Sequence, residues 1–128
     1  MLVRSGVSKI RLIDFDQVTL SSLNRHATAQ LKDVGMPKVE SVARYLQGTA
    51  PWATIEPINE LWSDTQSGYN LLNGKPDYVI DAIDHIPTKV ALLKYCKLNN
   101  IKVISCAGAG AKQDPSRVVS VINYYYYY

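Results

Sequence analysis

The sequence predicts an α/β protein with a Rossmann-like, doubly wound and mainly parallel sheet. Short runs of aliphatic and β-branched residues alternate with longer amphipathic segments, and this order implies crossover connections between parallel strands. Carboxylates stand at the ends of two of these runs, where sheets of this kind bind their ligands. With 128 residues, 47% of them hydrophobic, the chain can bury one core and is too short for two ordinary domains.

The first half of the chain is expected to hold two strands and one helix. A strand is predicted over residues 9–14, just before a loop rich in serine and asparagine. A helix is predicted to begin at Pro37, because proline suits the first helical position, and to be stopped by Gly48 and Pro51. Residues 54–58 indicate an edge strand, because their proline cannot donate a ladder hydrogen bond. One helical face carries the apolar side chains Val39, Val42, Ala43 and Leu46.

The second half is expected to continue the alternation of helix and strand. Its second helix should present Val90, Leu93 and the Lys94 stem on a face that continues toward Cys96. The elements predicted here are a weak helix over 62–72, a strand over 78–82, a helix from Pro87 to 99–100, a strand over 101–106 and an extended run over 117–124.

Charge and cysteine content narrow the functional classes. The net charge of +3 is mild and scattered, so it permits an RNA partner without favouring one. The two cysteines, Cys96 and Cys106, are too far apart for a chelating pair and too few for a disulfide scaffold, which favours a reducing compartment. No apolar run approaches the length of a membrane span and no secretion signal is evident, so we expect a soluble chain.

The carboxylates at predicted strand ends indicate a nucleotide site. Asp14, Asp81, Asp84 and the loop 107–110 all follow strands, and one crevice could hold them. A carboxylate at the end of the second strand of such a fold binds ribose hydroxyls, and a glycine-rich phosphate loop precedes it by about 20 residues. Counting about 20 residues back from Asp14 leads to a position before the first residue of this sequence. We therefore expect an incomplete domain that lacks the first strand and glycine loop, in which residues 1–6 end a helix at Gly6.

Four stretches together resemble a known family. Residues 12–16, 21–25, 35–40 and 81–84 are similar to the ATP-binding core of the superfamily that activates ubiquitin-like proteins and includes ThiF and MoeB. Within this superfamily, the chain most resembles the fungal and bacterial branch that dehydrates threonylcarbamoyladenosine in tRNA. This resemblance is carried by the form of the loop motif at residues 23–26, by Trp62 and by the stretch 108–115. The domains expected are a partial ThiF-type ATP-binding domain over 1–123 and a tyrosine tail over 124–128, which we interpret as a truncation or artefact.

The resemblance implies ATP-dependent cyclisation of threonylcarbamoyladenosine through adenylation of its carboxylate. It implies that Asp14 holds the ribose, that Arg25 and Lys38 contact the triphosphate and act in catalysis, and that Asp84 binds Mg²⁺. Ser22 and Asn24 complete the implied nucleotide contacts, although a sister-enzyme asparagine is replaced by Ser22, with Asn24 offset by two. The chemistry suits these groups, because cations and Mg²⁺ stabilise the charge that develops on the α-phosphate and departing pyrophosphate.

Other interpretations stay open. The implied partners are tRNA carrying threonylcarbamoyladenosine and a second copy of the protein, in the cytoplasm or at the mitochondrial outer membrane. One alternative is an adenylyltransferase that activates the C-terminus of a ubiquitin-like or sulfur-carrier protein, and another is a non-catalytic fragment. A nicotinamide-dependent dehydrogenase fits less well, because Asp84 and Lys38 have no part in hydride transfer.

Each candidate also has an ordinary structural interpretation. Asp16 is expected to stabilise its loop and Asp81 to accept nearby backbone N–H groups. Lys38 opposes the helix dipole in the first helical turn, which weakly indicates a ligand. His26 receives no role. Cys106 is expected to be a buried, inert thiol rather than a nucleophile.

Overall fold

The computed structural model describes residues 1–63, 65–106 and 120–122. Two compact units make up the chain, Met1–Leu61 and Trp62–Tyr128, and each has its own sheet and helices. Two of the three strand pairings in the described residues are parallel, and one is antiparallel. The predicted α/β class with mainly parallel strands is therefore confirmed.

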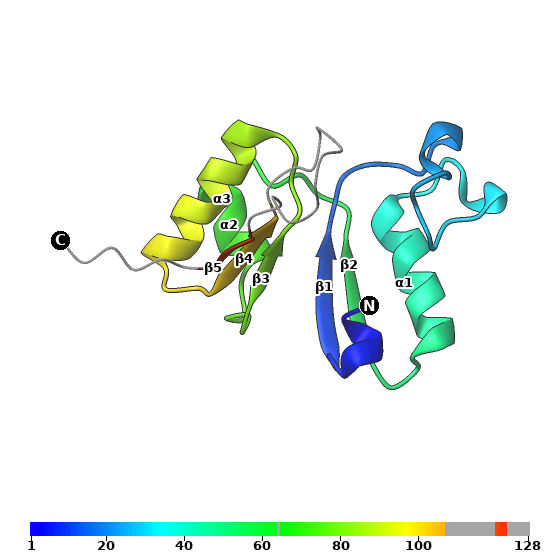
Figure 1. Cartoon of the computed structure of the whole chain (residues 1–128), viewed down its shortest axis with the longest axis horizontal. Coiled ribbons are helices and arrows are strands. Elements are labelled where there is room, and N and C mark those ends of the chain that lie inside the picture. Colours follow the sequence, from blue (N-terminus) through cyan, green and yellow to red (C-terminus); the bar gives the residue numbers. More distant parts are fainter. Residues whose placement is uncertain (64, 107–119, 123–128) are drawn as a thin grey trace. The chain divides into compact units, whose positions relative to one another are not determined.

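In the first unit, helix α1 (Lys38–Thr49) lies beside a two-stranded parallel sheet (Figure 1). Strand β1 (Lys9–Ile13) pairs with β2 (Thr54–Ile58) along their whole length. Pro37, predicted as the first helical residue, is instead the N-cap of α1, with a ψ of 134°, and the helix begins one residue later at Lys38. Gly48 and Pro51 were expected to end this helix, and α1 ends between them, at Thr49, one residue past Gly48.

The core of the first unit forms between this helix and the sheet. The predicted helical face is confirmed, with Val39 and Ala43 buried and Val42 and Leu46 half-buried. A 3₁₀ turn, Val3–Ser5, adds Val3 to the core and ends at Gly6, whose φ of 103° is left-handed and favours glycine. The core cluster comprises Val3, Ala43, Ala50 and Ile55, packed against Ile10, Leu12, Leu46 and Ala53.

A long loop joins β1 to α1 and is pinned at its two ends. Val18 is almost fully buried, and its N–H donates to the Met36 carbonyl at 2.7 Å. Its own carbonyl accepts the Gly35 N–H at 2.8 Å, and Gln17 forms a β-bridge with Pro37. The residues that directly follow β1 are thereby fixed next to the start of α1.

In the second unit, β3 (Val79–Asp81) pairs in parallel with β4 (Val103–Cys106), which pairs antiparallel with β5 (Ser120–Ile122). Helix α3 (Ile86–Leu98) carries Pro87 in its first turn and is followed by Asn99, as predicted. The weak helix is also present, as α2 (Thr65–Leu71), and begins three residues later than expected. An observed strand also lies within each remaining predicted segment. These segments are 78–82, 101–106 and 117–124.

The buried face of α3 differs from the predicted one. Val90 is 57% exposed and Lys94 is exposed, whereas Leu92, Tyr95 and Cys96 are buried. Tyr95 sets this rotation, because its ring stacks edge-on against Trp62 at 5.3 Å and Tyr69 at 5.8 Å between centroids. These aromatic contacts come from other segments, so the spacing of apolar residues within the helix did not reveal them.

Three further expectations concern membrane spans and residues at the end of the chain. Among the described residues, no helix combines the length and apolarity needed to span a membrane. The loop 107–110 and the tyrosine tail 124–128 lie outside the described residues.

Candidate functional site

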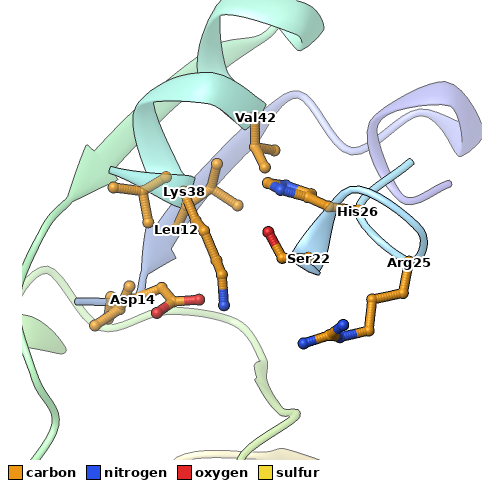
Figure 2. Close-up of a pocket in the computed structure, with 9 residues that line it drawn as sticks. Leu12, Asp14, Ser22, Arg25, His26, Lys38 and Val42 are labelled. Carbon is orange, nitrogen blue, oxygen red and sulfur yellow. The ribbon is translucent and has the colours of Figure 1, made fainter. Parts of the chain in front are cut away.

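A pocket of about 340 Å³ opens in the first unit, where β1, the loop after it and the start of α1 meet (Figure 2). Its charged residues are Asp14, Arg25 and Lys38, which we call the charged rim. Figure 2 shows the Lys38 ammonium close to the Asp14 carboxylate, with Arg25 extending toward the same region and His26 lying near Val42. The lining residues are Leu12, Ile13, Asp14, Ser22, Arg25, His26, Lys38, Val39 and Val42.

Two regular elements place Asp14 and Lys38. Asp14 directly follows β1, and its N–H donates to the Ile58 carbonyl at 3.3 Å, which extends the parallel ladder by one residue. Lys38 is the first residue of α1, and its N–H donates to the Asp16 carbonyl at 2.8 Å. Both side chains therefore stand on backbone that is held by hydrogen bonds, which limits how far they can move.

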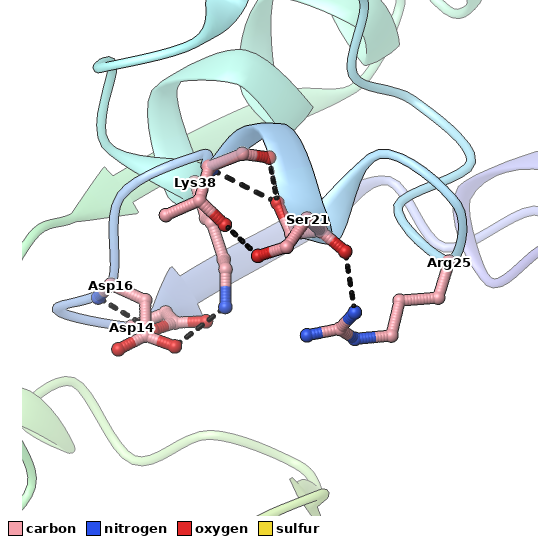
Figure 3. Close-up of polar contacts among 7 residues, drawn as sticks. Asp14, Asp16, Ser21, Arg25 and Lys38 are labelled. Atoms are coloured by element: carbon pink, nitrogen blue, oxygen red, sulfur yellow. Dashed lines mark hydrogen bonds and ion pairs between the residues drawn. The ribbon is translucent and has the colours of Figure 1, made fainter.

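A small turn in the loop places Arg25. Residues Leu20–Ser22 form a 3₁₀ turn, and the backbone N–H groups of Arg25 and His26 both donate to the Ser22 carbonyl. The Arg25 guanidinium donates through Nη1 to the Ser21 carbonyl at 2.8 Å (Figure 3). The same Nη1 also donates to Asn24 Oδ1 at 3.1 Å. Among the described residues, the hydrogen bonds of this guanidinium run through Nη1, so its Nε and Nη2 donors are available to bind an anion.

Ser22 and Asn24, both predicted to contact nucleotide, have local partners in this structure. Ser22 is buried, and its Oγ accepts the Thr19 N–H at 3.0 Å and donates to the Thr19 carbonyl at 2.8 Å. Asn24 is exposed, does not line the pocket, and orients Arg25. Their direct contact with a ligand stays a prediction.

His26 is the pocket residue that sequence reasoning left without a role. Its ring lines the pocket, and Nδ1 is buried without a hydrogen-bond partner in the described structure. The signal available in the sequence was its place next to Arg25, at the end of the same polar loop. The apolar lining residues Val39 and Val42 were predicted only as the packing face of the helix, and Leu12 as part of a strand.

The second unit contains a buried ion pair at the end of β3. Asp81 Oδ2 accepts Lys89 Nζ at 2.5 Å and Ser105 Oγ at 2.5 Å, and Oδ1 accepts the Ile83 N–H at 2.9 Å. Lys89 Nζ also donates to the Cys106 carbonyl at 3.0 Å. The prediction that Asp81 accepts nearby backbone N–H groups is confirmed, while its partner Lys89 was not foreseen.

Asp84 follows this strand end in the second unit and is exposed. Within the described ranges, no group of three His, Cys, Asp or Glu side chains is arranged to hold a metal ion. An exposed carboxylate still suits Mg²⁺, which keeps several waters and often takes one or two carboxylates together with substrate phosphates. The expected crevice shared by Asp14, Asp81 and Asp84 stays a prediction.

Of the two cysteines, Cys106 has a different environment from the one expected. Cys106, predicted to be buried, is exposed, because it is the last residue of β4. Cys96 is the buried thiol, on the inner face of α3, and burial there, with a smaller effect of the Asp81 carboxylate, raises its pKa to about 11. Cys96 is therefore a packing residue.

The charged rim favours a polyanionic ligand that also carries hydroxyl groups. Two cations, Arg25 and Lys38, stand beside the Asp14 carboxylate, and Lys38 is also paired with the Asp16 carboxylate. A planar guanidinium with an ammonium suits phosphate oxygens. The carboxylate accepts hydrogen bonds from hydroxyls, and the Leu12, Val39 and Val42 side chains supply apolar surface. A nucleotide has all of these complementary features.

Comparisons with known proteins agree with this description. A model described as ThiF family matches residues 1–123. The chain is 56% identical over 119 residues to tRNA threonylcarbamoyladenosine dehydratase 2 of Saccharomyces cerevisiae. This match covers 91% of this chain and 26% of that protein. It is 39% identical over 118 residues to the tRNA threonylcarbamoyladenosine dehydratase of Haemophilus influenzae, covering 91% and 44% respectively.

Among solved structures, the chain resembles E. coli tRNA N6-threonylcarbamoyladenosine dehydratase in complex with ATP. The TM-score is 0.83 at 32% sequence identity, and the match covers 91% of this chain and 47% of that one. The chain thus spans between about a quarter and just under half of the proteins it matches. On the family match and these identities, the chain belongs to the ThiF family.

Proposed function

We propose that this chain is the nucleotide-binding part of an enzyme that uses ATP to cyclise threonylcarbamoyladenosine in tRNA. The observation that carries the proposal is the charged rim beside an apolar pocket, in a chain 56% identical to a tRNA threonylcarbamoyladenosine dehydratase. A relative of the same name was crystallised with ATP, which supports ATP as the ligand of this pocket.

In this proposal, Asp14 accepts hydrogen bonds from the ribose hydroxyls, while Arg25 and Lys38 bind the phosphates. The substrate carboxylate attacks the α-phosphorus, an acyl adenylate forms, and pyrophosphate leaves. Arg25 and Lys38 stabilise the negative charge on the transferring and departing oxygens. A nucleophile within the same modified base then attacks the activated carbonyl, closes the ring and releases AMP, so no covalent cysteine is needed.

We also propose that Mg²⁺ accompanies ATP and that Asp84 is its protein ligand. When bound, Mg²⁺ supplies charge neutralisation on phosphate oxygens. Its role is tested by titrating Mg²⁺ into the chain with ATP present, comparing the wild type with Asp84→Asn. The homodimer and the mitochondrial outer membrane or cytoplasmic location implied by the resemblance stay predictions.

The binding step is tested by calorimetric titration of ATP·Mg²⁺ into the chain and into Asp14→Asn. Asparagine retains an oxygen that can accept the Asp16 N–H, so the turn after β1 is kept and only the charge is lost. Hydrogen bonds to charged groups contribute about 1.5–3 kcal/mol, which corresponds to an affinity loss of about 10- to 150-fold. Equal affinity in both proteins would show that Asp14 does not hold the ribose.

The reaction is tested with tRNA that carries threonylcarbamoyladenosine. We expect AMP, pyrophosphate and the cyclic nucleoside to form together, read by chromatography and mass spectrometry. A version extended upstream by the first strand and glycine loop of a relative is assayed in parallel. Formation of AMP only with a ubiquitin-like or sulfur-carrier protein, and not with modified tRNA, would contradict the proposal and favour the adenylyltransferase alternative.

A further inference from the structure

Asp16 contacts two residues of the charged rim, Asp14 and Lys38, through its N–H, its carbonyl and its carboxylate. Figure 3 shows the contacts of the Asp16 N–H and carboxylate. Its N–H donates to Asp14 Oδ1 at 2.8 Å, which fixes the direction of that carboxylate. Its carbonyl accepts the Lys38 N–H at 2.8 Å, at the start of α1. Its carboxylate Oδ2 accepts Lys38 Nζ at 2.5 Å.

The ion pair between Asp16 and Lys38 is partly open to solvent. The Lys38 side chain is 26% exposed and the Asp16 side chain 48%. Pairs this exposed are screened and add little to folding stability. Its main effect is therefore to restrict the four-carbon Lys38 side chain, which would otherwise sample many rotamers.

We propose that Asp16 is a positioning residue that holds Lys38 Nζ at the pocket before an anion arrives. The inference rests on the proposed function, in which Lys38 binds phosphate. An ammonium group has three N–H donors, so one can stay on Asp16 while the others meet phosphate oxygens. Ordering Lys38 in advance lowers the entropic cost of binding.

Asp16 also carries a negative charge, which opposes the approach of a phosphate. Positioning and repulsion predict opposite results when that charge is removed. Asp16→Asn separates them, because asparagine keeps the backbone N–H and carbonyl that serve Asp14 and α1. If positioning dominates, Asp16→Asn weakens anion binding by about 2- to 10-fold, the cost of ordering one long side chain.

The first measurement uses the chain without nucleotide. NMR of ¹⁵N-labelled lysine reports the order and proton exchange of the Lys38 ammonium, assigned by its loss in Lys38→Met. We expect a protected, ordered signal in the wild type and a mobile one in Asp16→Asn. The matched control is Glu56→Gln, which removes a carboxylate paired with Arg11 on the same unit and does not touch the pocket. An equally ordered Lys38 in Asp16→Asn overturns the proposal.

The second measurement is calorimetric titration of ATP·Mg²⁺ into the wild type, Asp16→Asn, Lys38→Met and the double variant. If Asp16 acts through Lys38, the 2- to 10-fold loss disappears in the Lys38→Met background. Unchanged or tighter binding by Asp16→Asn, or an equal loss in both backgrounds, overturns the proposal. If the wild type binds no ATP, the proposed function fails for this chain, and the ammonium signal alone decides whether Asp16 positions Lys38.

Discussion

Gly68→Ala tests the packing of the second unit against an internal control. Gly68 lies in α2, and a Cβ there would stand 2.5 Å from Trp62 Cη2 and 2.7 Å from Tyr95 Cε2. Both atoms belong to rings that pack edge-on against each other, so neither can withdraw freely. Gly48 lies in α1, where a Cβ would meet nothing within 4 Å.

The two glycines should therefore respond to alanine with opposite signs. Gly48→Ala is expected to stabilise the first unit by about 0.4–1 kcal/mol, because alanine reduces the conformational entropy of the unfolded chain. Gly68→Ala brings the same reduction in unfolded-state entropy, but its Cβ forces the Trp62 and Tyr95 rings apart. Overpacking of this kind costs about 1–3 kcal/mol. The expected net result at Gly68 is a loss of about 1 kcal/mol, within a range of about 0–2.5 kcal/mol.

Local probes are needed, because two compact units need not unfold together. Trp62 is buried in the second unit, whereas Trp52 is 67% exposed in the first. Urea unfolding followed by Trp62 fluorescence in a Trp52→Phe background reports the effect of Gly68→Ala. Hydrogen exchange of the α1 amides reports the effect of Gly48→Ala.

Equal stabilisation by the two substitutions would refute this reasoning, since it would mean that the space beside Gly68 is open. A loss at Gly48 similar to that at Gly68 would point to a general cost of alanine in these helices rather than to ring contacts. A change in the slope of the urea curve would show that the substitution alters more than stability.

Two further predictions concern the second unit. Lys89→Met should destabilise it by about 3 kcal/mol, because the fully buried Asp81 carboxylate loses its charged partner. Urea unfolding followed by Trp62 fluorescence measures this loss. A loss below about 1 kcal/mol would mean that Ser105 and the backbone contacts are enough to stabilise the buried carboxylate. Iodoacetamide at pH 8 should modify Cys106 rapidly and Cys96 only after unfolding, because Cys96 is buried with a pKa raised to about 11. Peptide mass spectrometry distinguishes the two thiols, and rapid labelling of native Cys96 would contradict its placement.

Local patterns were sufficient to predict the elements of the first unit. Helix α1 has a clear apolar period and a proline at its start, and β1 has a short aliphatic run before a polar loop. Both signals depend on residues that are neighbours in sequence. The helix continues one residue past Gly48, because a glycine costs only about 1 kcal/mol inside a helix, which packing of the preceding turns can offset.

The buried face of α3 could not be predicted from local sequence patterns. Val90 and Leu93 fit one helical stripe, but Leu92, Tyr95 and Cys96 form the buried one. The aromatic contacts that decide between the stripes join Tyr95 to Trp62 and Tyr69, which lie on segments far earlier in the chain. Amphipathic period alone carries no information about such partners.

The same distinction separates the two polar clusters. Asp14, Arg25 and Lys38 lie within one loop and its flanking elements and line one pocket. Their shared role was implied by the family resemblance, whereas spacing alone grouped Asp14 with the carboxylates of the second unit. Asp81, Lys89 and Ser105 meet only because β3 and β4 pair in a parallel register that sets Asp81 opposite Ser105. Lys89 then reaches the pair from α3, eight residues after Asp81. A shift of one residue in that register would turn Ser105 to the other face of the sheet, so the strand pairing itself maintains this cluster.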